Sequence, residues 1–231
     1  MNQRPFALSI VLVPLATLVL GAGCANLEAT FFKPKDSMVL LDELSGRIEQ
    51  VHVASEVSKE RMLAAVNTLR GIVSSDFRGN APAAYAELTR AIEQSEEQAD
   101  GLRECVDDMK DAAKTLFNRW AADLEGFTNA EMRMASQRRL EETRARYESI
   151  VNAVEPALWS YDAINRSLAD HALFLGHDFN RASVSAISSG VESLVGQSKD
   201  LETRLASSMT AAHAYLDAAA PPGAVAAEPP K

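Results

Sequence analysis

The fold is decided by residues 41–72, LDELSGRIEQVHVASEVSKERMLAAVNTLRGI. Apolar or small side chains recur there in alternating steps of three and four, at Leu41, Leu44, Ile48, Val51, Ser55, Ser58, Met62, Ala65, Leu69 and Ile72. This spacing puts them on one face of an α-helix and is typical of coiled-coil packing. Asp36 or Ser37 can cap the start, and residues 77–82, with Gly79 and Pro82, end the helix.

Three further stretches keep the same period. They run from Tyr85 to Trp120, from Leu140 to Leu168 and from Val184 to Tyr215. The third predicted helix covers residues 130–175 and contains Pro156, which should bend it. Residues 176–180 are predicted to form the next turn, with Asn180 capping the fourth helix.

The boundary between the second and third helices depends on residues 126–129. Gly126 weakens the helix, and Thr128 with Glu131 three residues later is a capping-box pattern. We expect a break here, with a kinked continuous helix as the alternative. Because short turns make neighbouring helices antiparallel, the sequence predicts an all-α, elongated antiparallel coiled-coil bundle of about four long helices over residues 37–217.

The first 24 residues have the order of an export signal. Arg4 precedes an apolar run, and the small residues Gly21, Ala22 and Gly23 lead to Cys24. Leu20 to Cys24 resembles a lipobox, which implies a lipoprotein signal peptide over residues 1–23 and lipid attachment at Cys24. Cleavage after Ala25, giving an unanchored periplasmic protein, and an uncleaved anchor are the alternatives.

A lipid on Cys24 would hold the chain on the cell envelope, facing the periplasm, because two or more acyl chains bind a bilayer stably. Ala25, where an Asp would retain enteric lipoproteins on the inner membrane, favours the outer membrane. Residues 24–36 are predicted to be a tether, and residues 218–231, rich in Ala and Pro, a disordered tail.

Charge and cysteine content exclude some functions. The chain has a net charge of −9, which disfavours nucleic acid and anionic lipid as partners. If Cys24 is acylated, Cys105 has no partner in its own chain. We expect Cys105 to be a half-buried apolar residue, with a disulfide between two copies as the alternative.

Five arginines crowd the start of the third helix and form a candidate docking face for an acidic protein or a phosphate-bearing lipid: Arg133, Arg138, Arg139, Arg144 and Arg146. The alternative is a solvated face, paired in part with the acidic second helix. Trp120, Trp159 and Phe127 are expected to fill wide layers of the bundle.

A metal site at Asp170, His171, His177 and Asp178 is disfavoured, because the two histidines cannot share a helix face. We expect instead that His177 and Asn180 fasten the turn through hydrogen bonds. The sequence has no nucleophile with a neighbouring base pattern, no phosphate-binding loop and no zinc spacing. We therefore predict no catalytic residues, no metal and no cofactor.

The second half of the chain resembles a family of predicted bacterial lipoproteins catalogued as domain of unknown function 2959. The matching residues are Leu116, Phe117, Trp120, Asn129, Met132, Arg133, Ser136, Leu140, Thr143, Tyr147, Glu155, Pro156 and Leu173 to Asn180. Gly176 replaces a basic residue of the family pattern, and Asp178 an asparagine. The resemblance implies a helical envelope protein and no activity.

The function expected from the anchor and the long bundle is a non-catalytic structural or adaptor lipoprotein of the cell envelope. Its partners would be the membrane, through the lipid, and an envelope protein or a second copy of the chain. Small residues in the seams bury little apolar area, which favours such association. The alternative is a lipid or small-ligand carrier with a groove between helices.

Overall fold

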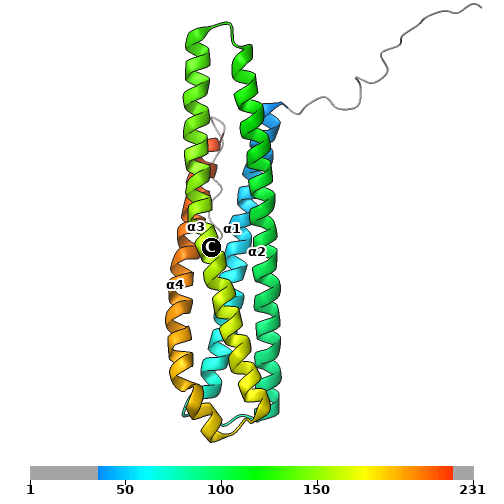
Figure 1. Cartoon of the computed structure of the whole chain (residues 1–231), viewed down its shortest axis with the longest axis vertical. Helices are drawn as coiled ribbons and strands as arrows, with labels where there is room; N and C mark the ends of the chain where they lie inside the picture. Colours follow the sequence, from blue (N-terminus) through cyan, green and yellow to red (C-terminus); the bar gives the residue numbers. More distant parts are fainter. Residues whose placement is uncertain (1–35, 221–231) are drawn as a thin grey trace, which may run out of the picture. The chain divides into compact units, whose positions relative to one another are not determined.

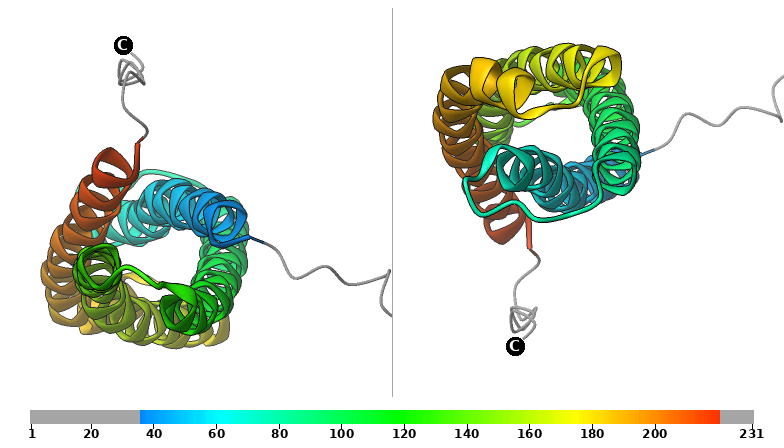
Figure 2. Two further views of the ribbon diagram at one scale, coloured as in Figure 1. Left: turned by 90° about the horizontal axis from the view of Figure 1, so that it is seen from above. Right: turned by 90° about the horizontal axis from the view of Figure 1, so that it is seen from below.

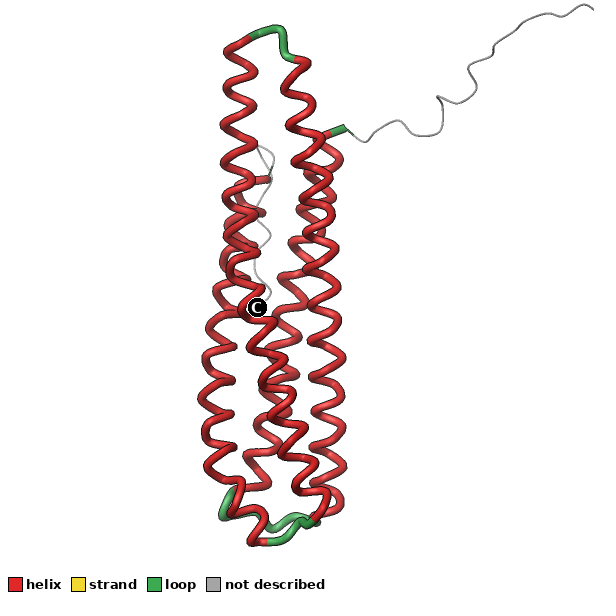
Figure 3. Tube along the Cα trace, in the orientation of Figure 1, coloured by secondary structure: helices red, strands yellow, loops and turns green. Residues whose placement is uncertain are grey.

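A computed structural model describes residues 36–220, where all regular secondary structure is helical and short turns join the helices (Figures 1 and 3). The helices are α1 (Ser37–Val73), α2 (Ala81–Asp123), the short 3-10 helix η1 (Leu124–Gly126), α3 (Ala130–His177) and α4 (Arg181–Ala219). The predicted all-α bundle is confirmed. The predicted break is a true hairpin between α2 and α3, and the continuous kinked helix is wrong.

The four long helices stand at the corners of a square when viewed along the bundle (Figure 2). Each packs against its two neighbours, in the order α1, α2, α3, α4 and back to α1, and α2 lies diagonally opposite α4. Neighbours run antiparallel, as their short turns require. The hairpin of α2 and α3 extends beyond the first turn of α1 (Figure 1).

The predicted seams form the core. Leu44, Ile48 and Val51 of α1 are fully buried, as are Leu88 and Leu102 of α2. Serines on the seams are buried as well, including Ser55, Ser58, Ser95, Ser198 and Ser208. Seam residues near the helix ends are only partly buried, among them Leu41, Tyr85, Trp120, Val184 and Ile187.

Asparagines cap three of the four long helices. The side chains of Asn80, Asn129 and Asn180 each accept hydrogen bonds from backbone N–H groups in the first turn that follows. The cap of α3 is therefore Asn129, not the predicted Thr128. Asp36 precedes α1 but makes no side-chain cap bond. The hydroxyl of Ser37 donates to Asp123 of α2 instead, at 2.6 Å.

The third helix is longer than predicted and passes through Gly176 to end at His177. A Cβ atom added at Gly176 would lie 2.6 Å from the hydroxyl oxygen of Tyr85. This contact explains why a long basic side chain would not fit here without displacing Tyr85. The helix also continues through Pro156, and α3 changes direction in its middle (Figure 3).

Two of the three aromatic predictions are wrong. Trp159 is 73% exposed and Phe127 is 38% exposed, so neither fills a layer of the core. Trp159 lies between the seam positions Ala157 and Tyr161 and points outward. Phe127 keeps the heptad spacing from Trp120 but follows η1 in the turn, where the helical period no longer sets the direction of a side chain. Trp120 is partly buried, and its indole N–H donates to Ser136 at 2.9 Å.

Residues 1–35 and 221–231 are outside the described part of the chain. The predicted signal peptide, Cys24 and most of the predicted tether and tail therefore have no structural test. Within residues 36–220, no helix combines the length and apolar character needed to cross a membrane.

Candidate functional site

The five arginines of the predicted docking face do not form one surface. Arg138 is exposed and makes no ion pair with residues 36–220, whereas the guanidinium of Arg144 lies 5.2 Å from the ring centroid of Phe117. Phe117 in turn packs edge to face against Tyr147. Arg144 therefore covers an aromatic pair at the surface, which is a structural role.

Arg133 belongs to a second surface, which we call the hairpin tip and define by Phe127, Met132, Arg133 and Met134. Arg133 pairs with Glu125 at 3.6 Å. Met132 and Met134 are 59% and 57% exposed. The two methionines are two residues apart and project from different sides of the first turns of α3. Exposed methionines are common at adaptable binding sites.

Arg139 and Arg146 lie at a third site, away from Arg133 and Arg144. They line a cavity of about 210 Å³ between the four helices, together with Leu41, Trp120, Thr143, Tyr215 and residues 218–220. We call it the Tyr215 cavity. Arg139 and Arg146 are seven residues apart, or two helical turns, and that spacing in the sequence could have placed them on a common face.

A buried polar layer crosses the bundle further along. The hydroxyl of Tyr161 donates to the backbone carbonyl of Ser58 at 2.9 Å. The hydroxyl of Ser95 donates to Asn165 Oδ1 at 2.7 Å and lies 3.3 Å from the Tyr161 oxygen. Burial raises the pKa of Tyr161 to about 12. The layer ties α1, α2 and α3 together. Asn165 is not among the site residues predicted from the sequence.

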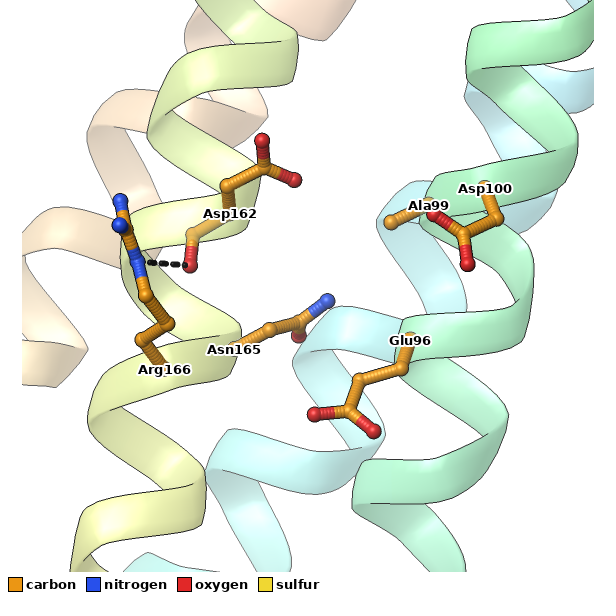
Figure 4. Close-up of a pocket in the computed structure, with 6 residues that line it drawn as sticks. All are labelled: Glu96, Ala99, Asp100, Asp162, Asn165 and Arg166. Carbon is orange, nitrogen blue, oxygen red and sulfur yellow. Dashed lines mark hydrogen bonds between the residues drawn. The ribbon is translucent and has the colours of Figure 1, made fainter.

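A shallow pocket of about 380 Å³ opens beside this layer, between α2 and α3 (Figure 4). Its lining residues are Glu96, Ala99, Asp100, Asp162, Asn165 and Arg166. Arg103 bridges Asp100 and Asp162, each at 2.6 Å. Asp100 and Asp162 thus already have a cationic partner, which favours a structural role for these two carboxylates in joining the helices.

His171 and His177, the two histidines of the disfavoured metal site, do not come together in the structure. His171 is held by a 2.6 Å contact from Nδ1 to the carbonyl oxygen of Ser167, and its ring lies against α4 at Gly190. At the turn, Asn180 donates to Asp178, whereas His177 makes no hydrogen bond with the described residues. The predicted fastening therefore holds for Asn180 only. In residues 36–220, no group of three or more metal-ligating side chains comes together.

A pair of histidines not noted in the sequence lies between α1 and α4. The rings of His52 and His213 meet edge to face with centroids 4.4 Å apart. Burial, and next the charge of His213, lower the pKa of His52. The Nδ1 atom of His52 is buried without a hydrogen-bond partner among the described residues.

Cys105 packs partly buried against the core, and burial raises the pKa of its thiol. This environment fits the expectation of a half-buried apolar residue and disfavours a reactive thiolate.

A family model described as a protein of unknown function, DUF2959, matches residues 38–218. The chain belongs to this family. The DUF2959 match runs from the second residue of α1 almost to the end of α4, so the family defines the whole four-helix bundle. No curated protein matches the chain.

Proposed function

We propose that this DUF2959 protein is a non-catalytic adaptor of the cell envelope, anchored by lipid at Cys24, that binds a partner protein through its hairpin tip. The observation that carries the proposal is the exposure of Phe127, Met132 and Met134 where α2 and α3 extend past α1. Exposed apolar side chains of this kind gain free energy when a partner covers them.

The position of the first helix adds support. Ser37 donates to Asp123, so α1 begins beside the end of α2 that carries the tip. Residues 24–36 connect Cys24 to this end, and such a tether reaches at most about 40 Å. An anchored protein would therefore present its tip near the envelope surface to which the lipid attaches, on the periplasmic side and with the outer membrane favoured.

The tip is tested by photo-crosslinking in living cells. A photoreactive amino acid at Met132 is compared with one at Val53, which is 55% exposed on α1. The proposal predicts a crosslink to one other envelope protein from position 132 and none from position 53. A crosslink to lipid alone, to a second copy alone, or equally from both positions would contradict the adaptor role.

The anchor is tested separately by labelling with a palmitate analogue. Wild type should take up the label and fractionate with membranes, and Cys24→Ser should lose both properties. Unchanged fractionation of Cys24→Ser would contradict the anchor while leaving the tip hypothesis intact.

A second candidate function, carriage of a small ligand, is favoured by the Tyr215 cavity. Side chains from all four long helices line the cavity, and one of these residues, Tyr215, has a buried hydroxyl without a partner among the described residues.

A further inference from the structure

The Tyr215 cavity lies where α4 ends and α1 begins. Leu41 comes from α1, Trp120 from α2, Arg139 and Arg146 from α3, and Tyr215 from α4. Its volume of about 210 Å³ exceeds the room that one or two waters need. A small organic molecule of roughly ten non-hydrogen atoms fits a space of this size, well below the volume of a drug-sized pocket.

The decisive group is the hydroxyl of Tyr215. The side chain is 1% exposed, and its oxygen has no hydrogen-bond partner among the residues that the structure describes. A buried hydroxyl left unpaired costs about 1–3 kcal/mol. Burial raises the pKa of Tyr215, against the opposing effect of Arg146, so the group stays protonated and can donate.

The two arginines set the charge of the cavity. Neither Arg139 nor Arg146 forms an ion pair with any of residues 36–220, and Arg146 has only a 3.5 Å contact to the hydroxyl of Thr143. That hydroxyl donates to the carbonyl of Arg139 at 2.7 Å. No carboxylate lines the cavity. Two guanidinium groups and one O–H donor therefore favour an anionic oxygen.

The remaining walls are apolar. Leu41, Trp120 and residues 218–220 contribute aliphatic and aromatic surface. The hydrogen bond from Trp120 to Ser136 fixes the indole in place. An ion such as free phosphate would leave this surface uncovered, whereas a carboxylate on a short hydrocarbon body would cover it.

We propose that the Tyr215 cavity binds a small carboxylate with an apolar body, whose carboxylate accepts hydrogen bonds from Tyr215 and from Arg139 or Arg146. The hydrocarbon part packs against Leu41 and Trp120. This site is independent of the hairpin tip, so either proposal can fail without the other.

The test uses hexanoate as the probe and isothermal titration calorimetry on the chain from Cys24 onward, prepared as Cys24→Ser. Hexanol matches the hydrocarbon without the charge, and inorganic phosphate supplies the charge without the hydrocarbon. Hexanoate should bind at least about tenfold more tightly than either control.

Three variants locate the site. Tyr215→Phe removes only the hydroxyl and should weaken hexanoate binding about tenfold or more. Arg146→Gln should weaken it similarly, whereas Arg138→Gln, outside the cavity, should leave it unchanged. Thermal melting shows that each variant is folded, so lost binding is not lost structure.

Several results would overturn the proposal. They are the absence of hexanoate binding, equal binding by the wild type and Tyr215→Phe, and equal effects of Arg146→Gln and Arg138→Gln. Hexanol bound as tightly as hexanoate would mean an apolar slot with no role for the arginines. Phosphate bound as tightly would mean a general anion site.

Discussion

Tyr161 and Tyr215 occupy equivalent inner positions on α3 and α4, yet their hydroxyls have opposite surroundings. Both side chains are almost wholly buried, at 0% and 1% exposure. The Tyr161 hydroxyl bonds to Ser58 and neighbours Ser95. The Tyr215 hydroxyl is buried without a partner within residues 36–220, and the Tyr215 residue lines a cavity.

The contrast extends to the helices around each tyrosine. The satisfied polar layer joins α1, α2 and α3. The buried polar atoms without partners in the described part of the chain belong to α1 and α4: His52 Nδ1, Ser208 Oγ and Tyr215 Oη. A buried polar group is retained either for the specificity of a network or for a ligand. Tyr161 fits the first role and Tyr215 the second.

The largest expected effect comes from removing Tyr161 entirely. Tyr161→Ala leaves a cavity in the polar layer and should lower the free energy of unfolding by about 3–5 kcal/mol. Trp159→Ala, two residues away and 73% exposed, should change it by less than about 0.5 kcal/mol. Urea denaturation measures both, and equal losses would show that Tyr161 does not anchor the layer.

Alkaline pH should separate Tyr161 from exposed tyrosines. Its pKa is raised to about 12 in the folded protein, whereas it is about 10 when unfolded. Its contribution is therefore complete below about pH 10 and is lost as the pH rises toward 12. Between pH 9 and 11.5, wild type should lose on the order of 2 kcal/mol more stability than Tyr161→Phe. Parallel losses in both proteins would contradict this assignment.

A smaller loss is expected at Asn165. Asn165→Ala removes the acceptor of the buried Ser95 hydroxyl and should cost about 1–2 kcal/mol in urea denaturation. Asn152→Ala, at an exposed position of the same helix, should be neutral or slightly stabilising because alanine favours a helix. Equal changes in the free energy of unfolding of the two variants would contradict a structural role for the polar layer.

The smallest effect concerns His52, which shares with Tyr215 a buried atom without a partner. Because the pKa of His52 is lowered on folding, the unfolded chain binds the proton more tightly and stability falls as the pH drops below about 6.5. His52→Phe should reduce the fall between pH 7.5 and 5.5 by less than about 1 kcal/mol, since solvent screens the half-buried ring. If His52→Phe had the same pH dependence of stability as the wild type, His52 would not be a buried group that folding destabilises in its charged form.

Helical period was enough to predict the bundle from the sequence, because it records which face of each helix is apolar. It located Tyr161 and Tyr215 on inner seams but could not distinguish them. The distinction depends on whether partners from other helices reach each hydroxyl. Asn165 could not be predicted, because a single polar residue beside a seam looks like a surface position in the sequence. Only the structure shows that Ser95 of α2 lies opposite it.

The errors in the predicted site have the same cause: the sequence does not show which side chains come together in space. Arg139 and Arg146 were grouped with Arg133 and Arg144 by proximity in the chain, although the helix separates them onto different faces. The expectation that Trp159 fills the core rests on hydrophobicity alone, although the helical period places Trp159 between the seam positions Ala157 and Tyr161. The prediction of lipid attachment at Cys24 rests on a targeting pattern, and labelling with a palmitate analogue tests it directly.

The most direct test of the contrast between the two tyrosines is urea denaturation of Tyr161→Phe and Tyr215→Phe without ligand. Each variant loses one oxygen atom from an otherwise intact side chain. Tyr161→Phe should lose about 1 kcal/mol or more, because it breaks a buried hydrogen bond, and Tyr215→Phe should stay within about 0.5 kcal/mol of the wild type or gain stability. Equal losses in the two variants would contradict the assignment of Tyr161 to structure and Tyr215 to ligand binding.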